Sequence, residues 1–272
     1  MNLSPLPYID GFLLAYSLSA NAVPDSEYHC ENDYEIMYVR RGSRKAFVKD
    51  YSYKLISGNL LFIDKNFLHK TQYMSDEYER FVINFTEDYV MSSVKSQMHI
   101  LFKQQIFAPP KLSATDKFFF SMFSEWEKLR KNDPLAKDAL KNYINLLLIH
   151  FIRHFSEYAY NDAKIINPTI ERLVQHMNIN FKLPITLENS AKMLHLSPSY
   201  LSRIFFKYTG FGFLEYLKIL RIEHGKNLLE NTEMNIKQIA FECGFNDSNY
   251  FSSVFKSETG VSPLQYRKNT IL

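Results

Sequence analysis

The chain has 272 residues, of which 46% are hydrophobic and 22% charged, a composition ordinary for soluble globular proteins and a length that allows two domains. Its formal net charge is only +3, and all of this excess lies in residues 165–272, which carry 12 basic and 9 acidic side chains. Two cysteines exclude a disulfide framework, and no run approaches the about 18 apolar residues of a membrane helix. Because no basic segment precedes an apolar one at the N-terminus, we expect a cytoplasmic protein.

Residues 1–108 are predicted to form a domain of short β-strands. Apolar runs alternate with turn residues such as Gly42 and Ser57-Gly58-Asn59, and many short strands at such intervals indicate a sandwich or barrel. The expected strands include residues 34–39, 46–48, 51–53, 60–63 and 81–85. The high aromatic share, 15%, favours large cores or ring-lined pockets. Possible lining residues, each also compatible with a plain core, are Tyr8, Phe12, Tyr38 and Phe62.

Four polar residues of the same domain are candidates for binding a ligand. They are His29, Glu31, Glu35 and His69, to which the aromatic Tyr38 is added. Polar groups among aromatic rings suit a small-molecule pocket, whereas structural hydrogen bonds within the domain are the alternative role for the same residues.

From Lys111 onward the apolar residues follow helical spacing. Two amphipathic helices are predicted, one with a stripe from Phe119 to Leu129 and one with a stripe from Leu140 to Phe155. The helices either pack against the sheet domain or provide the interface of a homodimer. The polar stretch 157–164 is predicted to be a linker.

The last part of the chain is predicted to be entirely helical, beginning with a helix over residues 165–180. Thr186 is expected to cap a second helix, and Ser197-Pro198 has the features of a third helix start. This third helix should turn Leu201 and Phe205 inward. Its expected outward residues are Ser199, Tyr200, Ser202, Arg203, Phe206 and Lys207.

Residues 236–256 have the layout of a helix-turn-helix. Ile236, Ile239, Ala240 and Cys243 give one apolar face, and Gly244 is expected to form the turn. Asn235 and Gln238 form a capping-box pattern at the first helix, and Asn246 or Asp247 is expected to cap the second. The side chains expected to face outward from the second helix are Ser248, Asn249, Ser252, Ser253 and Lys256.

This pattern occurs twice in the chain. At a shift of 49 residues, three positions of the first copy match the second: Ala191 with Ala240, Leu194 with Cys243 and Leu196 with Phe245. At a shift of 50, six later positions match: Tyr200 with Tyr250, Leu201 with Phe251, Phe205 with Phe255, Gly210 with Gly260, Leu214 with Leu264 and Tyr216 with Tyr266. Two chemically uneven copies fit tandem helix-turn-helix units better than a solenoid. The predicted connecting helix covers residues 212–229.

The outward residues suggest how each unit would read DNA. Arg203 can form paired hydrogen bonds with guanine and Asn249 with adenine, so sharper discrimination is expected from the first unit, which has the arginine. Lys207 and Lys256 suit phosphates, with a solvated surface as the alternative. Tyr200, like its repeat partner, is either a packing residue or a phosphate contact. A connector of about 27 Å is shorter than the about 34 Å between adjacent major-groove faces, which predicts bent DNA or one loosely seated helix.

The second motif resembles the signature of the AraC/XylS family of bacterial transcription regulators. The matching positions are Ile239, Ala240, Cys243, Gly244, Phe245, Asp247, Tyr250, Phe251, Phe255, Lys256, Gly260, Pro263, Tyr266 and Arg267. The family favours Ala where this chain has Gly225, and the glycine is expected to soften the connecting helix. A looser resemblance, to the cupin-type sensor domain of such regulators, lies in His29-x-Glu31-x-x-x-Glu35, Gly42, Gly58-Asn59-Leu60-Leu61 and Leu68-His69.

The resemblance implies an α+β multidomain protein that is not an enzyme. Its parts would be an N-terminal cupin-like (jelly-roll) β-barrel sensor over residues 1–108, a helical dimerisation and linker segment over 109–163, and an all-α DNA-binding domain with two helix-turn-helix motifs over 164–272. A homodimer would bind double-stranded promoter DNA, respond to a small molecule such as a sugar, and activate by contacting RNA polymerase. No cofactor, metal or membrane is expected.

Two alternatives to this function stay open. One is a cupin metalloenzyme fused to a DNA-binding module, which would need iron or manganese on His29 and His69. Glu31 stands where the cupin pattern has a second histidine, which leaves that set short of imidazole. The other is a regulator without a small-molecule effector, which would respond to a protein partner or to its own abundance.

Overall fold

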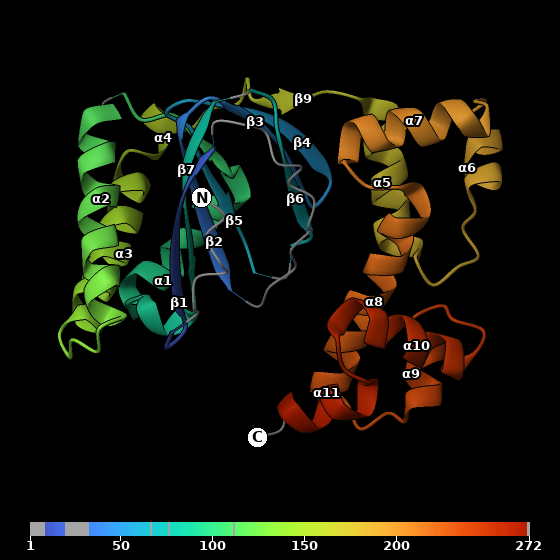
Figure 1. The fold of residues 1–272 in the computed structure, drawn as a ribbon. Helices are drawn as coiled ribbons and strands as arrows, with labels where there is room; N and C mark the ends of the chain where they lie inside the picture. The colour runs from blue at the N-terminus through green and yellow to red at the C-terminus, as the bar shows by residue number, and fades with distance from the viewer. Residues whose placement is uncertain (1–8, 20–32, 66, 76, 111, 271–272) are drawn as a thin grey trace. The chain divides into compact units, whose positions relative to one another are not determined.

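The computed structural model describes residues 9–19, 33–65, 67–75, 77–110 and 112–270. The chain divides into two compact units, the first ending at Ile165 and the second beginning at Ile166 (Figure 1). The first unit holds two β-sheets and a helical layer, and the second consists of helices. The β-rich fold predicted for the N-terminal part and the helical fold predicted for the C-terminal part are therefore confirmed.

The strands of the first unit form two antiparallel sheets with orders β1-β7-β2-β5-β8 and β6-β3-β4-β9. The described strands do not close into the predicted barrel, because no ladder among them joins one sheet to the other. The unit is instead a sandwich. Its strands are β1 (Phe12–Ser19), β2 (Tyr34–Arg41), β3 (Ser43–Val48), β4 (Tyr51–Ile56), β5 (Leu60–Ile63), β6 (His69–Tyr73), β7 (Tyr78–Phe85), β8 (Ile106–Phe107) and β9 (Lys164–Ile165).

Strand β2 separates two apolar cores. Ile36 and Tyr38 belong to the core shared with the helices, whereas Met37 and Val39 belong to the core shared with the second sheet. All four side chains are buried, so the strand reads as a continuous apolar run without alternation.

Helices cover one face of the five-stranded sheet, with α2 and α3 side by side in Figure 1. These elements are η1 (Glu87–Tyr89), α1 (Ser92–Gln104), α2 (Leu112–Leu129), α3 (Ala136–Arg153) and α4 (Phe155–Tyr158). The sequence did not predict α1, although Val94, Met98 and Leu101 are buried at helical spacing. Helix α3 is shorter than its apolar stripe, because the backbone leaves the helical conformation at His154 (φ −104°, ψ 24°).

The stretch 157–164 is packed onto the first unit and is not the free linker that its polarity suggested. Tyr158 and Ala163 are buried, and Ala159 forms a β-bridge with Phe107. Strand β9 then pairs with β4. The few apolar residues of the stretch hold it on the sheets, because removing their side chains from water is favourable, while the polar side chains of the stretch stay in contact with water.

The second unit contains seven described helices: α5 (Pro168–Asn180), α6 (Leu187–Met193), α7 (Pro198–Thr209), α8 (Phe213–Asn231), α9 (Ile236–Glu242), α10 (Ser248–Thr259) and α11 (Pro263–Thr270). Helix α5 begins at Pro168, three residues after its predicted start, and Asn167 caps it. The expected caps of the other helices are confirmed, with side-chain oxygens that accept from the N–H three residues later: Thr186, Ser197, Asn235 and Asp247.

Candidate functional site

The two helix-turn-helix motifs share the backbone geometry of their turns. The residue that reverses the chain has a positive φ in both, 56° at His195 and 80° at Gly244, and only glycine adopts such a φ without strain. The predicted turn at Gly244 is confirmed. One hydrogen bond of 2.9 Å closes each turn, from Leu196 N–H to Ala191 C=O and from Phe245 N–H to Ala240 C=O.

The recognition helices α7 and α10 also end alike. The Thr209 hydroxyl donates to the carbonyl four residues earlier at 2.9 Å and accepts from the N–H two residues later at 3.0 Å. Thr259 makes the same two bonds at 2.8 and 3.4 Å. Gly210 and Gly260 follow in the left-handed conformation, so both helices are capped at each end.

Two arginines fix the segments that lead into the motifs, a role that the sequence did not predict. Arg221 donates to the carbonyls of Phe181 and Leu183 at 2.8 and 2.9 Å. Arg267 donates to carbonyls at the end of α8 and in the loop before α9, with its shortest bond 2.7 Å to Met234. The family resemblance marked both residues in the sequence, Arg221 in the connector and Arg267 in the second motif, but without this role.

Gly225 allows a close approach inside the second motif. A Cβ atom at this position would lie 3.1 Å from the Phe251 ring and 3.4 Å from the Cys243 sulfur. Helix α8 continues through the glycine, which allows α8 to pack tightly on α10. Burial in this core raises the pKa of the Cys243 thiol to about 12, which keeps the thiol protonated and unreactive.

The outward face of α7 carries the residues proposed to read DNA. Ser199, Tyr200, Arg203 and Lys207 are exposed, and Ser202 is half-buried. Because these residues are spaced three and four apart, they share one side of the helix. The Arg203 guanidinium lies over the Tyr200 ring, 5.5 Å from its centroid, which restrains both side chains.

The corresponding face of α10 has a different chemistry. Asn249, Ser253 and Lys256 are exposed, whereas Ser248 and Ser252 are half-buried. The Ser252 hydroxyl donates to the Ser248 carbonyl at 2.8 Å, so its proton is already used within the helix. Asn249 and Ser253 are therefore better placed to donate to a partner.

The candidate ligand residues Glu35 and His69 meet between the two sheets. The His69 Nε2 lies 3.3 Å from the Glu35 carboxylate, and the Asn84 amide donates to the same oxygen at 3.4 Å. Glu35 and His69 are buried. His29 and Glu31, predicted for the same site, and Tyr8 lie outside the described residues. Within the described part of the chain, no group of three or more His, Cys, Asp or Glu side chains is arranged to hold a metal ion.

A second set of polar side chains lies between the same two sheets, with Arg44 buried and Arg80 half-buried. Arg44 donates to the Thr71 hydroxyl at 2.5 Å and Arg80 reaches it at 3.5 Å. The two guanidinium groups lie 4.6 and 5.7 Å from the centroid of the Tyr78 ring. The space between the sheets is therefore lined by hydrogen-bonding groups as well as by apolar ones.

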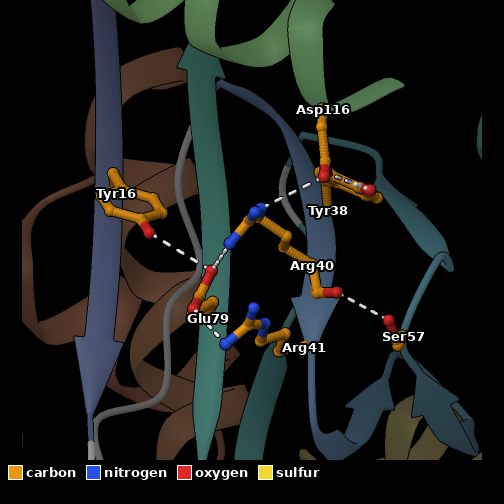
Figure 2. Close-up of polar contacts among 7 residues, drawn as sticks. All are labelled: Tyr16, Tyr38, Arg40, Arg41, Ser57, Glu79 and Asp116. Carbon is orange, nitrogen blue, oxygen red and sulfur yellow. Dashed lines mark hydrogen bonds and ion pairs between the residues drawn. The ribbon is translucent and has the colours of Figure 1, made fainter. Parts of the chain in front are cut away.

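Tyr38 lies on the opposite face of its strand from Glu35. Its hydroxyl donates to Asp116 at the start of α2 at 2.7 Å, and burial, followed by this carboxylate, raises the pKa of Tyr38. Figure 2 shows Arg40 between Asp116 and Glu79, paired with both. Phe12 and Phe62 face the helices as well. The predicted residues thus fall on two sides of the sheet.

The Glu79 carboxylate is the centre of this network. It pairs with Arg40 and, at 3.5 Å, with Arg41, and it accepts from the Tyr16 hydroxyl at 3.3 Å. The Ser57 hydroxyl donates to the Arg40 carbonyl at 2.6 Å (Figure 2). The network joins strands β1, β2 and β7 to α2.

Comparison with known proteins identifies the parts of the chain. A family model described as an AraC-like ligand binding domain matches residues 18–141, and one described as a helix-turn-helix domain matches residues 190–269. None of the helices in the described part of the chain has the length and hydropathy to cross a membrane.

Curated relatives and solved structures with similarity to parts of the chain include transcription regulators. The chain is 39% identical over 98 residues to the uncharacterized HTH-type transcriptional regulator YijO of Escherichia coli strain K12, covering 36% of this chain and 35% of the relative. It is 33% identical over 137 residues to the HTH-type transcriptional activator RhaR of Salmonella typhimurium, covering 50% of this chain and 48% of the relative. The match thus spans half or less of these relatives. The C-terminal domain of AraT, a response regulator of Geobacillus stearothermophilus, is 38% identical with a TM-score of 0.37, over 38% of this chain and 86% of that one.

Proposed function

Since the chain belongs to the AraC family of transcription regulators, we propose that it binds promoter DNA through α7 and α10 and activates transcription when a small molecule binds its first unit. The observation that carries the DNA-binding role is the repeated motif, in which two recognition helices share caps and turn geometry and expose hydrogen-bonding side chains. Short polar residues on an exposed recognition helix suit the edges of bases in the major groove.

Arg203 and Asn249 are proposed as the main base readers, and Lys207 and Lys256 as phosphate contacts. Ser199, Tyr200, Ser202, Ser248, Ser252 and Ser253 complete the proposed interface. The stacking of Arg203 on Tyr200 supports its role, because a restrained guanidinium loses less freedom on binding.

Selection of binding sites from random duplex DNA by the full chain, followed by fluorescence anisotropy, tests this function. Arg203→Ala should weaken binding to the selected site by about 1–3 kcal/mol and relax the preference at one position. Lys256→Ala should weaken all sequences alike and reduce the salt slope by about 1. The matched control is Arg130→Ala, which removes one positive charge from the first unit. Equal losses for Arg130→Ala and Arg203→Ala, or no selected sequence at all, would exclude the proposed interface.

The length of α8 supports bending of the bound DNA. Its 19 residues span about 28 Å at about 1.5 Å per residue, less than the about 34 Å between successive major-groove faces. Engaging both recognition helices would therefore bend the duplex toward the protein or leave one helix loosely seated. Circular-permutation gel shifts that showed straight DNA with both half-sites protected would contradict this.

The interior between the sheets is the proposed effector site. Glu35, His69 and Asn84 form one polar group and Arg44 and Arg80 a second, and both offer hydrogen bonds suited to a small hydroxylated molecule such as a sugar. Thermal-shift screening of the full chain against sugars and metabolites tests this, because a molecule that binds the folded state raises its melting temperature. A hit whose effect survives Glu35→Gln and Arg80→Gln would place the effector elsewhere.

We also propose that the active form is a homodimer that contacts RNA polymerase. The exposed Leu146 of α3 supports dimerisation through this helix, since an apolar side chain 59% exposed gains by burial against a second copy. Leu146→Glu should shift the full chain from dimer to monomer in sedimentation experiments. The same sedimentation profile for both proteins would remove α3 from the interface.

A further inference from the structure

Two histidines come together where α3 ends. His150 lies in the last turn of the helix, and His154, one turn later, is its C-terminal cap. Their ring centroids are 4.7 Å apart, and both side chains reach solvent. Histidines four residues apart on a helix can bind one metal ion, because the spacing puts them on the same face.

The ring of His154 is held in a defined orientation and tautomer. Its Nδ1 lies 2.9 Å from the Glu157 carboxylate, and its ring stacks on Tyr158 at 5.0 Å with an angle of 11° between the planes. An ionised carboxylate only accepts hydrogen bonds, so Nδ1 is the nitrogen that donates to Glu157 and Nε2 is the nitrogen left to face an ion. A carboxylate behind a histidine in this way is the usual partner of a metal ligand.

The spacing of the rings fits a shared ion. An imidazole nitrogen binds zinc at about 2.0–2.1 Å, which places the ion about 3.2 Å from the ring centroid. Two such rings at a 90° to 109° angle have centroids about 4.5–5.2 Å apart. The observed 4.7 Å lies within this interval.

We propose that His150 and His154 bind a divalent late transition-metal ion such as Zn²⁺, Ni²⁺ or Cu²⁺, with Glu157 as the residue that positions His154. Imidazole suits these ions, whereas Mg²⁺ prefers oxygen. Water completes the coordination, since the described residues offer no third His, Cys, Asp or Glu ligand here.

The surroundings favour a cation at this place. The negative end of the α3 dipole lies at His154, although the neighbouring Arg153 opposes it.

Isothermal titration of the full, untagged chain with ZnCl₂, and with MgCl₂ as the control ion, tests the proposal. The wild type should bind Zn²⁺ at a saturable site that Mg²⁺ does not occupy. His150→Ala and His154→Ala should abolish this site, and Glu157→Gln should weaken it about tenfold. The matched control is His99→Ala, which removes an exposed histidine from α1 and should leave the titration unchanged.

Electron paramagnetic resonance after addition of one equivalent of Cu²⁺ provides a second readout, in which two coordinating nitrogens are expected for the wild type and loss of this signal for His150→Ala. The proposal is overturned if Zn²⁺ shows no saturable binding, or if His150→Ala binds as the wild type does. It is equally overturned if Glu157→Gln leaves the affinity unchanged and His69→Ala abolishes binding, since the ion would then lie between the sheets. None of these outcomes depends on DNA binding.

Discussion

Replacing Gly244 by alanine should destabilise the second unit more than replacing Gly260 by alanine. Gly244 has φ +80°, and a Cβ atom there would lie 2.7–3.0 Å from backbone atoms of Lys182. Backbone cannot rotate away as the end of a flexible side chain can, so the change combines an unfavourable φ with a collision. Gly260 has nearly the same φ, +78°, but nothing within 4 Å of its Cβ position.

The comparison of these glycines separates the two effects. Forcing an L-residue into the left-handed region costs about 1–2 kcal/mol, the loss expected for Gly260→Ala. The collision at Gly244 adds about 1–3 kcal/mol of overpacking, for a total of about 2–5 kcal/mol. His195 has φ 56° at the matching turn, so His195→Gly should raise the free energy of unfolding of the second unit by up to about 1 kcal/mol.

Urea unfolding of the full chain can report the two units separately. The only tryptophan, Trp126, is buried in the first unit, so its fluorescence follows that unit. Far-ultraviolet circular dichroism includes the helices of the second unit. We expect Gly244→Ala to shift the helical transition and leave the fluorescence transition in place. Equal losses for Gly244→Ala and Gly260→Ala would show that the Lys182 contact is irrelevant and refute the reasoning.

Three further outcomes follow from single side chains. Burial lowers the pKa of His224, so the folded state binds fewer protons than the unfolded one; the stability of the second unit should fall as the pH drops below about 6.5, and His224→Phe should flatten this dependence in urea midpoints. Thr209→Val should cost about 1–2 kcal/mol by leaving a buried N–H unpaired, and the less buried Thr259→Val should cost less, both read by circular dichroism. Glu79→Gln should lower the free energy of unfolding of the first unit by about 1–3 kcal/mol, since it leaves the partly exposed Arg40 with a weaker partner. Urea unfolding followed by Trp126 fluorescence measures this loss.

How far the sequence predicted the structure depends on how local the signals are. The caps, the turn glycine and the apolar faces of the second motif all lie within a few residues of one another, and each was predicted from spacing alone. The network of Figure 2 joins residues 39 positions apart (Arg40 and Glu79) and 78 apart (Tyr38 and Asp116). No local pattern encodes such pairs, because strand order decides them.

The division of the candidate ligand residues has a different, local cause. Tyr38 and Glu35 are three positions apart, and in a strand an odd separation puts side chains on opposite faces. The sequence analysis grouped them because aromatic rings together with polar groups suit a small-molecule pocket, whereas the period-two rule already separates them. Alternation could therefore have removed Tyr38 from the group with Glu35 and His69, but only once the strand itself was certain.

The two helix-turn-helix motifs share their turns and helix ends but differ in the outward side chains of α7 and α10. Turn closure, helix caps and the threonine–glycine ends are common to both, so the scaffold presents α7 and α10 from matched local frameworks. Any difference in sequence preference between them must then come from the outward side chains. Arg203, restrained by Tyr200, offers a fixed fork of donors, whereas α10 offers Asn249 and serines. If the proposed interface is correct, we expect the first motif to discriminate more sharply between bases and the second to depend more on the shape of the DNA.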